Sequence, residues 1–169
     1  MGHRPSRDKR VSTHLILAAR AFGAEKAYYT GIQDYSLEES IRKITLDWGG
    51  DFSVEYASSW KTVLGNWEGK VVHLTMYGLP FQDLVGEIRS DPSPKLIVVG
   101  GAKVPGEVYS AAHWNVAVTG QPHSEVSALA LFLHELFQGR ELSLDFTGAR
   151  LKVIPQTRGK KMQTRTKRV

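Results

Sequence analysis

The chain has 169 residues, of which 41% are hydrophobic and 23% are charged, and its formal net charge at pH 7 is +5. These values predict one globular domain that is large enough to bury a hydrophobic core without covalent cross-links. The sequence contains no cysteine, which excludes disulfides, thiolate catalysis and cysteine zinc sites. No apolar run approaches the ~20 residues of a membrane span, and the N-terminus lacks the apolar core of a signal peptide, so we expect a cytoplasmic protein without a membrane partner.

The basic charge is concentrated at the two ends of the chain. Residues 1–20 contain five basic residues and one acid, and residues 146–169 contain eight basic residues and no acid. The ends therefore carry +12, which leaves −7 for the middle of a chain whose total is +5. An acidic body with basic ends is expected of a chain that contacts a phosphate backbone. A solvated tail that keeps the protein soluble explains the same charges equally well.

The first part of the chain alternates helical and extended patterns. Apolar residues at helical spacing follow Ser12 and Thr13, either of which can cap a helix. Ser36 and Glu39 have the spacing of a capping box ahead of a second helical pattern. We therefore predict, in chain order, a helix over 11–23, a strand over 26–31, a helix over 36–48, a strand over 52–57 and a helix over 58–66.

The second part of the chain continues this alternation. In chain order we predict a strand over 71–77, a helix over 81–88, a strand over 96–99, a short helix over 106–112, a strand over 115–118 and a helix that ends at 137. Such alternation predicts an α/β fold with a mostly parallel sheet and helices on both faces. Ligands bind such sheets at the carboxyl ends of the strands, and the unusual residues of this chain follow three of these ends, at 74–78, 100–104 and 118–125.

The turn at 100–105, Gly-Gly-Ala-Lys-Val-Pro, allows a ligand to approach the backbone closely and adds one cation. It is neither a P-loop nor a dinucleotide fingerprint, because the Gly-Lys-Ser/Thr ending and the Gly-x-Gly-x-x-Gly spacing are both missing. An ordinary strand-to-helix turn explains this sequence as well as a ligand-binding turn does.

The segment 121–125, Gln-Pro-His-Ser-Glu, invites several chemical interpretations. A Ser-His-Glu triad is disfavoured because adjacent residues cannot align as nucleophile, base and orienting group. A zinc deaminase is disfavoured because its Pro-Cys-x-x-Cys motif requires cysteine, and the six histidines show no other metal-binding pattern. We expect a helix N-terminus with Pro122 in its first turn, Ser124 as its cap and Glu125 near the positive end of the dipole, where backbone N–H groups bind the ligand.

The segment 2–10 is dense in cations and precedes the first predicted helix. A solvated face is the simplest interpretation. The functional alternative is that these cations bind a phosphate, or that one of the arginines is catalytic, beside the crevice at the three strand ends.

Six motifs follow one another along nearly the whole chain: Gly-His-Arg-Pro-x-Arg-Asp-Lys-Arg-Val-Ser-Thr-His (2–14), Ala-Arg-Ala-Phe-Gly-Ala (19–24), Trp-Gly-Gly (48–50), Val-Val-His-Leu-Thr-Met-Tyr-Gly (71–78), Val-Val-Gly-Gly-Ala-Lys-Val-Pro (98–105) and Gln-Pro-His-Ser-Glu-Val (121–126). In this order they resemble the archaeal tRNA (cytidine(56)-2′-O)-methyltransferase family. That family belongs to the SPOUT class of S-adenosylmethionine-dependent enzymes.

The resemblance implies a SPOUT-type fold whose C-terminal part forms a deep trefoil knot, an exception to the rule against knots. It implies a homodimer that methylates the T-loop of tRNA and needs no metal. It also implies that S-adenosyl-L-methionine is held by three loops, which correspond here to Leu74, to Gly100, Gly101, Ala102, Lys103 and Val104, and to Val118, Thr119, Gly120, Gln121, Pro122, His123, Ser124 and Glu125.

An arginine assists the reacting hydroxyl in SPOUT enzymes of this type, and by position we expect Arg10 to have this role, with Arg7 as the second candidate. We expect one methyltransferase domain over 1–155 and a basic, mobile tail over 156–169. Family members carry a hydrophobic strand ahead of the Gly-His-Arg-Pro motif, and we expect such a strand upstream of this sequence. A SPOUT enzyme for another RNA site and a non-catalytic RNA-binding module are the alternative functions.

Overall fold

The computed structural model describes residues 1–101 and 103–164, with only the backbone of Asp8 and Lys9. Its helices are α1 (Pro5–Ala21), α2 (Tyr35–Trp48), α3 (Trp60–Gly65), α4 (Phe81–Ser90), α5 (Gly106–Ala111) and α6 (Glu125–Phe137), followed by the 3₁₀ helix η1 (Arg140–Ser143). Its strands are β1 (Lys26–Tyr29), β2 (Ser53–Tyr56), β3 (Lys70–Pro80), β4 (Lys95–Val99), β5 (Trp114–Ala117), β6 (Leu151–Val153) and β7 (Met162–Thr164).

The predicted alternation of helices and strands is confirmed, but two predicted helix starts are wrong. Helix α1 begins at Pro5 rather than at residue 11, because the fixed φ of proline suits the first turn of a helix. Most of the cationic segment therefore lies in the first turns of α1. Helix α2 is capped by Asp34 rather than by a Ser36–Glu39 box.

Asp34 caps α2 because its carboxylate reaches three donors at once. Its Oδ1 atom accepts hydrogen bonds from the backbone N–H groups of Ser36 and Leu37, at 2.9 and 3.1 Å, and from the Ser36 hydroxyl at 2.6 Å. The other oxygen lies 3.4 Å from Nε2 of buried His3. The Ser36 hydroxyl is the main reason why the pKa of Asp34 falls to about 2, so this cap is ionised at neutral pH.

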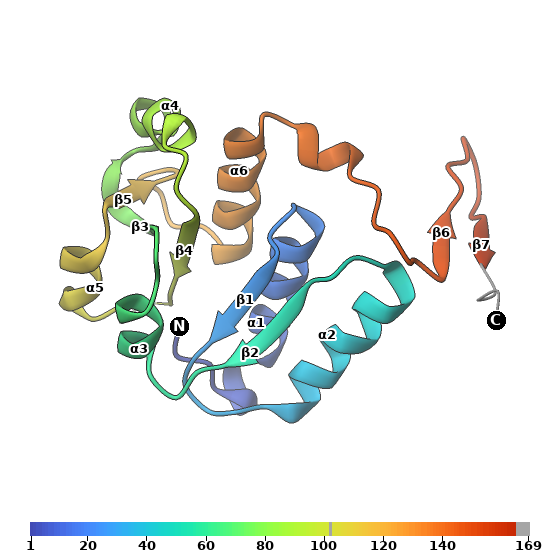
Figure 1. The fold of residues 1–169 in the computed structure, drawn as a ribbon, viewed down its shortest axis with the longest axis horizontal. Helices are drawn as coiled ribbons and strands as arrows, with labels where there is room; N and C mark the ends of the chain where they lie inside the picture. Colours follow the sequence, from blue (N-terminus) through green and yellow to red (C-terminus); the bar gives the residue numbers. More distant parts are fainter. Residues whose placement is uncertain (102, 165–169) are drawn as a thin grey trace.

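The strands form two parallel sheets and one antiparallel hairpin (Figure 1). Strand β1 pairs in parallel with β2, and β3 lies between its parallel neighbours β4 and β5. The prediction of a mostly parallel α/β fold is thereby confirmed, although the strands are divided between two sheets. Strands β6 and β7 form the hairpin, which the hydrophobic pattern did not indicate.

Side chains of β3 alternate between two hydrophobic clusters, so helices cover both faces of its sheet. Val72 and Leu74 belong to the larger cluster, which buries α4 and α6 and extends to α1, α2 and Tyr29 of β1. Val71 points to the smaller cluster, which contains Val108 of α5 and is flanked by residues of α3. This alternation is the period of two that a strand imposes.

Helix α6 packs mainly against α1 and α4 and joins the two sheets. Its side chains Leu129, Phe132 and Leu133 are buried in the larger cluster. Burying each such side chain stabilises the fold by roughly 1.5–3 kcal/mol. None of the described helices has the length and hydropathy that a bilayer span requires.

The hairpin β6–β7 stands apart from the two sheets (Figure 1). The segment just before it is anchored at the end of α2. Arg20 stacks 4.7 Å from the ring centre of Phe146 and donates a 2.6 Å hydrogen bond to the carbonyl of Gly49. Gly49 has φ +81°, and a Cβ there would lie 2.6 Å from the carbonyl oxygen of Thr147. Glycine at this position therefore allows the chain after α6 to lie directly against the end of α2.

Candidate active site

The carboxyl ends of β3, β4 and β5 meet at one edge of the three-stranded sheet. Leu74 of β3 is paired with Val99 of β4 on one side and with Val116 of β5 on the other. The residues that follow Leu74 within β3, the turn after β4 and the segment after β5 therefore begin side by side, as the sequence predicted, although β3 itself continues to Pro80. Leu74 itself is buried and forms part of the larger hydrophobic cluster.

Strand β3 contains an irregularity at this edge. Leu74 and Leu79 both oppose Val116, so the intervening residues bulge out of the β3–β5 ladder. The bulge ends at Gly78, where a Cβ atom would lie 2.5 Å from the backbone carbonyl of Asn115 and from the amide nitrogen of Val116. Only glycine allows this approach, because backbone atoms on both strands would have to move to admit a methyl group.

The turn after β4 is equally tight at its first glycine. A Cβ at Gly100 would lie 2.4 Å from a methyl group of Val104, whereas Gly101 faces open space. Gly100, Gly101, Lys103 and Val104 line a cavity of about 280 Å³ together with Met1, Gly2, Thr30, Gly31, Ser58, Trp60 and Pro105. Ala102, also predicted to hold the cofactor, lies outside the described residues.

The third segment leads from β5 into α6. Val118 is half-buried, and the residues from Thr119 to Ser124 are exposed. Ser124 caps α6 as predicted, since its hydroxyl accepts a 3.1 Å hydrogen bond from the Val126 amide. Pro122 precedes this cap and does not lie in the first turn, which begins at Glu125.

A buried polar network that the sequence reasoning missed connects these strand ends. Nδ1 of His73 lies 2.9 Å from Oδ1 of Asn115, whose amide nitrogen donates a 2.9 Å hydrogen bond to the carbonyl of Tyr109. Burial lowers the pKa of His73, so the ring is neutral and donates from Nδ1. The Tyr109 hydroxyl in turn lies 3.1 Å from that of Thr75, in the bulge. The sequence contained one signal of this network, which is the presence of a histidine within the largely apolar segment 71–77.

Nε2 of His73 is buried and has no hydrogen-bond partner in the described part of the chain. The ring packs edge-on against Tyr109, with ring centres 4.6 Å apart. An unpaired neutral ring nitrogen costs less than an unpaired charge, which agrees with the direction of the pKa shift.

Arg7 and Arg10 are both exposed on α1. Neither of them lines the cavity beside Gly100, although Met1 and Gly2 do. The three predicted loops thus begin at one sheet edge, but only the turn after β4 lines this cavity. Leu74, the segment 118–125 and the two arginines lie outside its lining. The described residues contain no group of three or more potential metal ligands.

A model of the family "tRNA ribose 2′-O-methyltransferase, aTrm56" matches residues 48–163. A tRNA (cytidine(56)-2′-O)-methyltransferase of Methanothermobacter thermautotrophicus is 53% identical over 166 residues, which cover 96% of this chain and 93% of the relative. One from Thermococcus kodakarensis is 50% identical over 167 residues, with coverage of 96% and 93%.

A crystal structure of an RNA 2′-O ribose methyltransferase resembles the fold with a TM-score of 0.55 at 21% identity. The similarity covers 76% of this chain and 51% of that one. At this identity the likeness supports the α/β fold alone.

The glycine at the bulge provides a prediction about stability. We expect Gly78→Ala to lower the free energy of unfolding by roughly 1–3 kcal/mol, because the added methyl group meets backbone atoms that cannot relax independently. Gly120→Ala is the matched control, since a Cβ there meets nothing within 4 Å. Denaturant unfolding of both variants measures the difference, and an equal stability of the two would contradict the close approach.

Proposed function

The chain belongs to the tRNA ribose 2′-O-methyltransferase family, and we propose that it transfers a methyl group from S-adenosyl-L-methionine to the 2′-hydroxyl of cytidine 56 in the T-loop of tRNA. The observation that carries this proposal is an identity of 53% over nearly the full length to a protein named for this reaction. In the reaction an O–C bond forms at the 2′-oxygen, the C–S bond of the donor breaks, and the hydroxyl proton leaves.

The residues at the sheet edge fit a cofactor of this kind. Gly101 in the turn after β4 faces open space, so a ligand can approach its backbone closely, and the exposed segment before α6 offers further backbone donors and acceptors. When bound, S-adenosyl-L-methionine supplies an activated methyl group whose leaving group is a neutral thioether. We propose that Leu74, 100–104 and 118–125 bind this cofactor, mainly through the main chain.

The protein must then orient the 2′-hydroxyl and remove its proton. We assign this role to Arg10, with Arg7 as the second candidate. An arginine guanidinium is always protonated at neutral pH and is therefore a poor base. The part of the arginine is to hold the hydroxyl or a neighbouring phosphate while the proton leaves. The exposed position of both arginines on α1 suits a site that a second subunit completes.

The family assignment extends to the wider organisation of the molecule. We propose a homodimer with the site near the subunit interface, a deep trefoil knot formed by the C-terminal part of the SPOUT fold, and a cytoplasmic location. We further propose that 1–155 form the methyltransferase domain and that 156–169 act as a basic RNA-binding tail.

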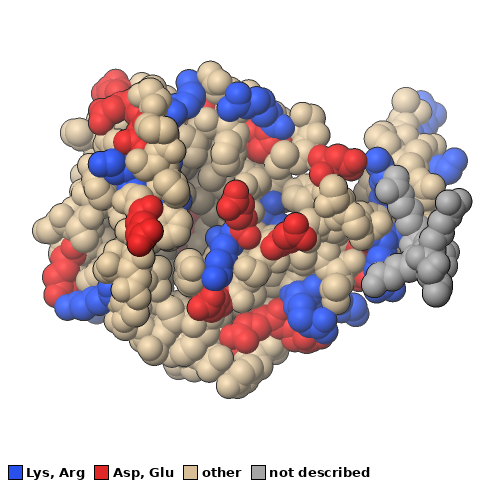
Figure 2. Space-filling model, viewed as in Figure 1, with Lys and Arg blue, Asp and Glu red and all other residues tan. Residues whose placement is uncertain are grey.

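The described part of this tail belongs to the hairpin β6–β7, where basic side chains gather. Arg158, Lys160 and Lys161 are exposed there, while Arg150 pairs with Asp47 at 3.2 Å. Figure 2 shows Lys and Arg side chains over the hairpin without acidic ones beside them, whereas acidic and basic side chains are mixed over the rest of the visible face. The basic hairpin and the start of α1 would contact the RNA backbone, and the acidic body would not.

The proposed function is tested by incubating the protein with labelled S-adenosyl-L-methionine and an unmodified archaeal tRNA transcript. We expect one 2′-O-methyl group at cytidine 56, located by nucleotide mapping, and no transfer to a transcript that carries 2′-deoxycytidine at this position. Methylation elsewhere would assign the enzyme to another RNA site. Binding of tRNA without any methyl transfer would indicate a non-catalytic RNA-binding module instead.

The role of Arg10 gives a second prediction. We expect Arg10→Ala to lower kcat at least ~100-fold, as the loss of a group that assists proton removal does, and to leave cofactor affinity nearly unchanged. Arg42→Ala on α2 is the control, because that arginine is exposed and pairs with Glu39. Unchanged turnover in Arg10→Ala would remove this residue from the mechanism.

The basic hairpin gives a third prediction, which concerns salt. We expect tRNA affinity to fall steeply with salt, and the triple variant Arg158→Ala, Lys160→Ala and Lys161→Ala to reduce the slope of log K against log salt by roughly 2–3. Lys61→Ala, which removes an exposed cation of α3 paired with Glu107, serves as the control. A slope that does not change in the triple variant would exclude the hairpin from phosphate contacts.

A further inference from the structure

Exposed apolar side chains gather on the bulge of β3 and directly after it. Met76, Tyr77 and Leu79 are 39%, 79% and 62% exposed, and we refer to these three side chains as the bulge patch. Tyr77 is the most exposed of the large hydrophobic side chains in the described part of the chain. The four residues of β3 ahead of Thr75 are, by contrast, all buried. An exposed apolar patch on a globular domain often marks a place where another molecule binds.

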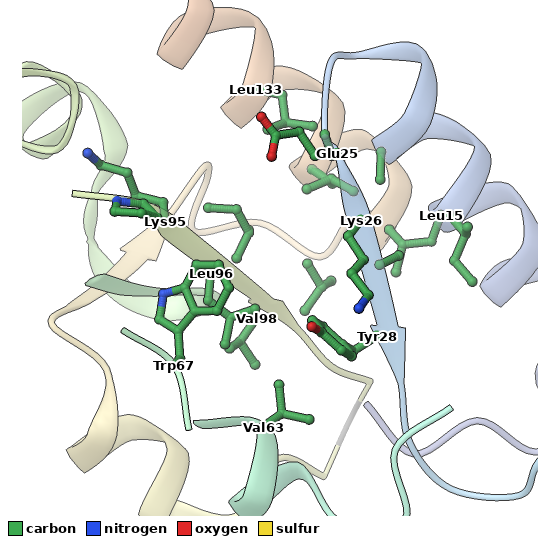
Figure 3. A pocket seen from close by; sticks show the side chains of 18 of the residues that line it. Leu15, Glu25, Lys26, Tyr28, Val63, Trp67, Lys95, Leu96, Val98 and Leu133 are labelled. Atoms are coloured by element: carbon green, nitrogen blue, oxygen red, sulfur yellow. The ribbon is translucent and has the colours of Figure 1, made fainter. Parts of the chain in front are cut away.

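The bulge patch is separate from the apolar interior. A cavity of about 590 Å³ lies between β1 and β4, and Figure 3 shows Tyr28, Leu96 and Val98 around it. The side chains of the bulge patch do not line this cavity or the one beside Gly100, and neither hydrophobic cluster includes them. Packing within the described residues therefore does not explain why the patch is apolar.

Hydrogen bonds hold the backbone that carries Tyr77. Its N–H group donates to the Thr75 hydroxyl over 3.4 Å, and this hydroxyl lies 3.1 Å from that of Tyr109 on α5. The Tyr109 carbonyl in turn accepts a 2.9 Å hydrogen bond from the side chain of Asn115. The next residue, Gly78, is packed against the backbone of β5. A side chain that is exposed on a fixed backbone loses little freedom when a ligand binds, which suits a binding residue.

The bulge lies between the other two segments of the sheet edge. Leu74, directly ahead of the bulge, pairs with Val99, after which the turn at Gly100 begins. Leu79, directly after the bulge, pairs with Val116, and β5 ends one residue later. Tyr77 is therefore placed among the loops to which we assign the cofactor, at the edge where the second reactant must also arrive.

The second reactant is a nucleotide, and its base needs a surface to contact. A direct methyl transfer brings the ribose against the cofactor, and the base is attached to the same ribose. Enzymes that act on one nucleotide commonly take it out of its stack, and unstacked RNA bases are commonly bound on aromatic side chains. A tyrosine ring offers such a face with only two side-chain torsions to fix. Three side chains by themselves fall well short of the ~800 Å² that each partner buries in a stable protein interface.

We propose that the Tyr77 ring stacks on the base of the nucleotide whose ribose is methylated, and that Thr75 and Tyr109 are positioning residues for this ring. The inference rests on the proposed function, which makes cytidine 56 this nucleotide. Every base has a π-face, so stacking supplies affinity and orientation rather than a choice among bases.

The contact is tested by photocrosslinking to a tRNA that carries 5-iodocytidine at position 56, in the presence of S-adenosyl-L-homocysteine. We expect a crosslink to Tyr77 that persists in Tyr77→Phe and falls at least ~10-fold in Tyr77→Leu, because leucine keeps apolar bulk but has no π-face. Tyr35→Leu is the matched control, since Tyr35 is 72% exposed at the start of α2. A crosslink at another residue, with an unchanged yield in Tyr77→Leu, would overturn the proposal.

The energy of the stack is tested by tRNA affinity. We expect Tyr77→Leu to weaken tRNA binding roughly 10–100-fold, with unchanged affinity for S-adenosyl-L-methionine and unchanged free energy of unfolding. An abasic ribonucleotide at position 56 should weaken binding to the unmodified protein similarly. The two changes together should cost little more than either alone, because each removes one side of the same contact. Additive losses would overturn the proposal.

The positioning role is tested by Tyr109→Phe, which removes the hydroxyl beside Thr75 and keeps the ring that packs against His73. We expect the crosslink yield at Tyr77 to fall several-fold while the affinity for S-adenosyl-L-methionine stays the same. An unchanged yield would exclude Thr75 and Tyr109 from this role.

The outcomes distinguish this inference from the proposed function. Methylation of cytidine 56 with the same kcat/KM in Tyr77→Leu would overturn the stacking and leave the function intact. A protein that methylates no cytidine 56 even without substitution would refute the proposed function itself. A change in sedimentation of Tyr77→Leu would place the bulge patch between two copies of the chain and would overturn the stacking as well.

Discussion

The parallel pairing of β3 with both β4 and β5 is the constraint on which the site depends. Because all three strands run in the same direction, the segments after Leu74, Val99 and Ala117 emerge at one edge. After the bulge that ends at Gly78, β3 pairs with β5 again at Leu79 and Pro80. The hydrogen bonds among His73, Asn115 and Tyr109 link β3, β5 and α5 as well. The exposed loops are thus supported by a rigid layer beneath them, as binding loops on α/β folds generally are.

The two sheets are held together by helices rather than by strand pairing. The larger hydrophobic cluster extends from Tyr29 of β1 to Val116 of β5, and Phe132 of α6 lies within it. Among the described strands no pairing joins the two sheets, so cohesion between them rests on the burial of apolar area, which is a non-directional interaction.

The sequence allowed the element order and the parallel arrangement to be predicted, because these follow from periodicity. The assignment of a cofactor site to the glycine-rich strand ends stays a prediction. The sequence did not reveal the start of α1, because Pro5 is compatible with a loop and with a first helical turn alike. The cap at Asp34 was missed although its hydrogen bonds to Ser36 and Leu37 are local, because Ser36 and Glu39 also have the spacing of a capping box. The partners of His73 were not predictable either, since Asn115 lies 42 positions away. The division of the sheet is likewise a property of tertiary structure, invisible in any single strand pattern.

Residues 1–3 link several parts of the molecule that are distant in sequence. Met1 donates to the last carbonyl of β4 and lines the cavity beside Gly100, and Gly2 donates to the Thr30 hydroxyl. His3 contacts Ser12 of α1 as well as the cap of α2. The basic start of α1 follows immediately, so the placement of Arg7 and Arg10 is set by how these three residues are held.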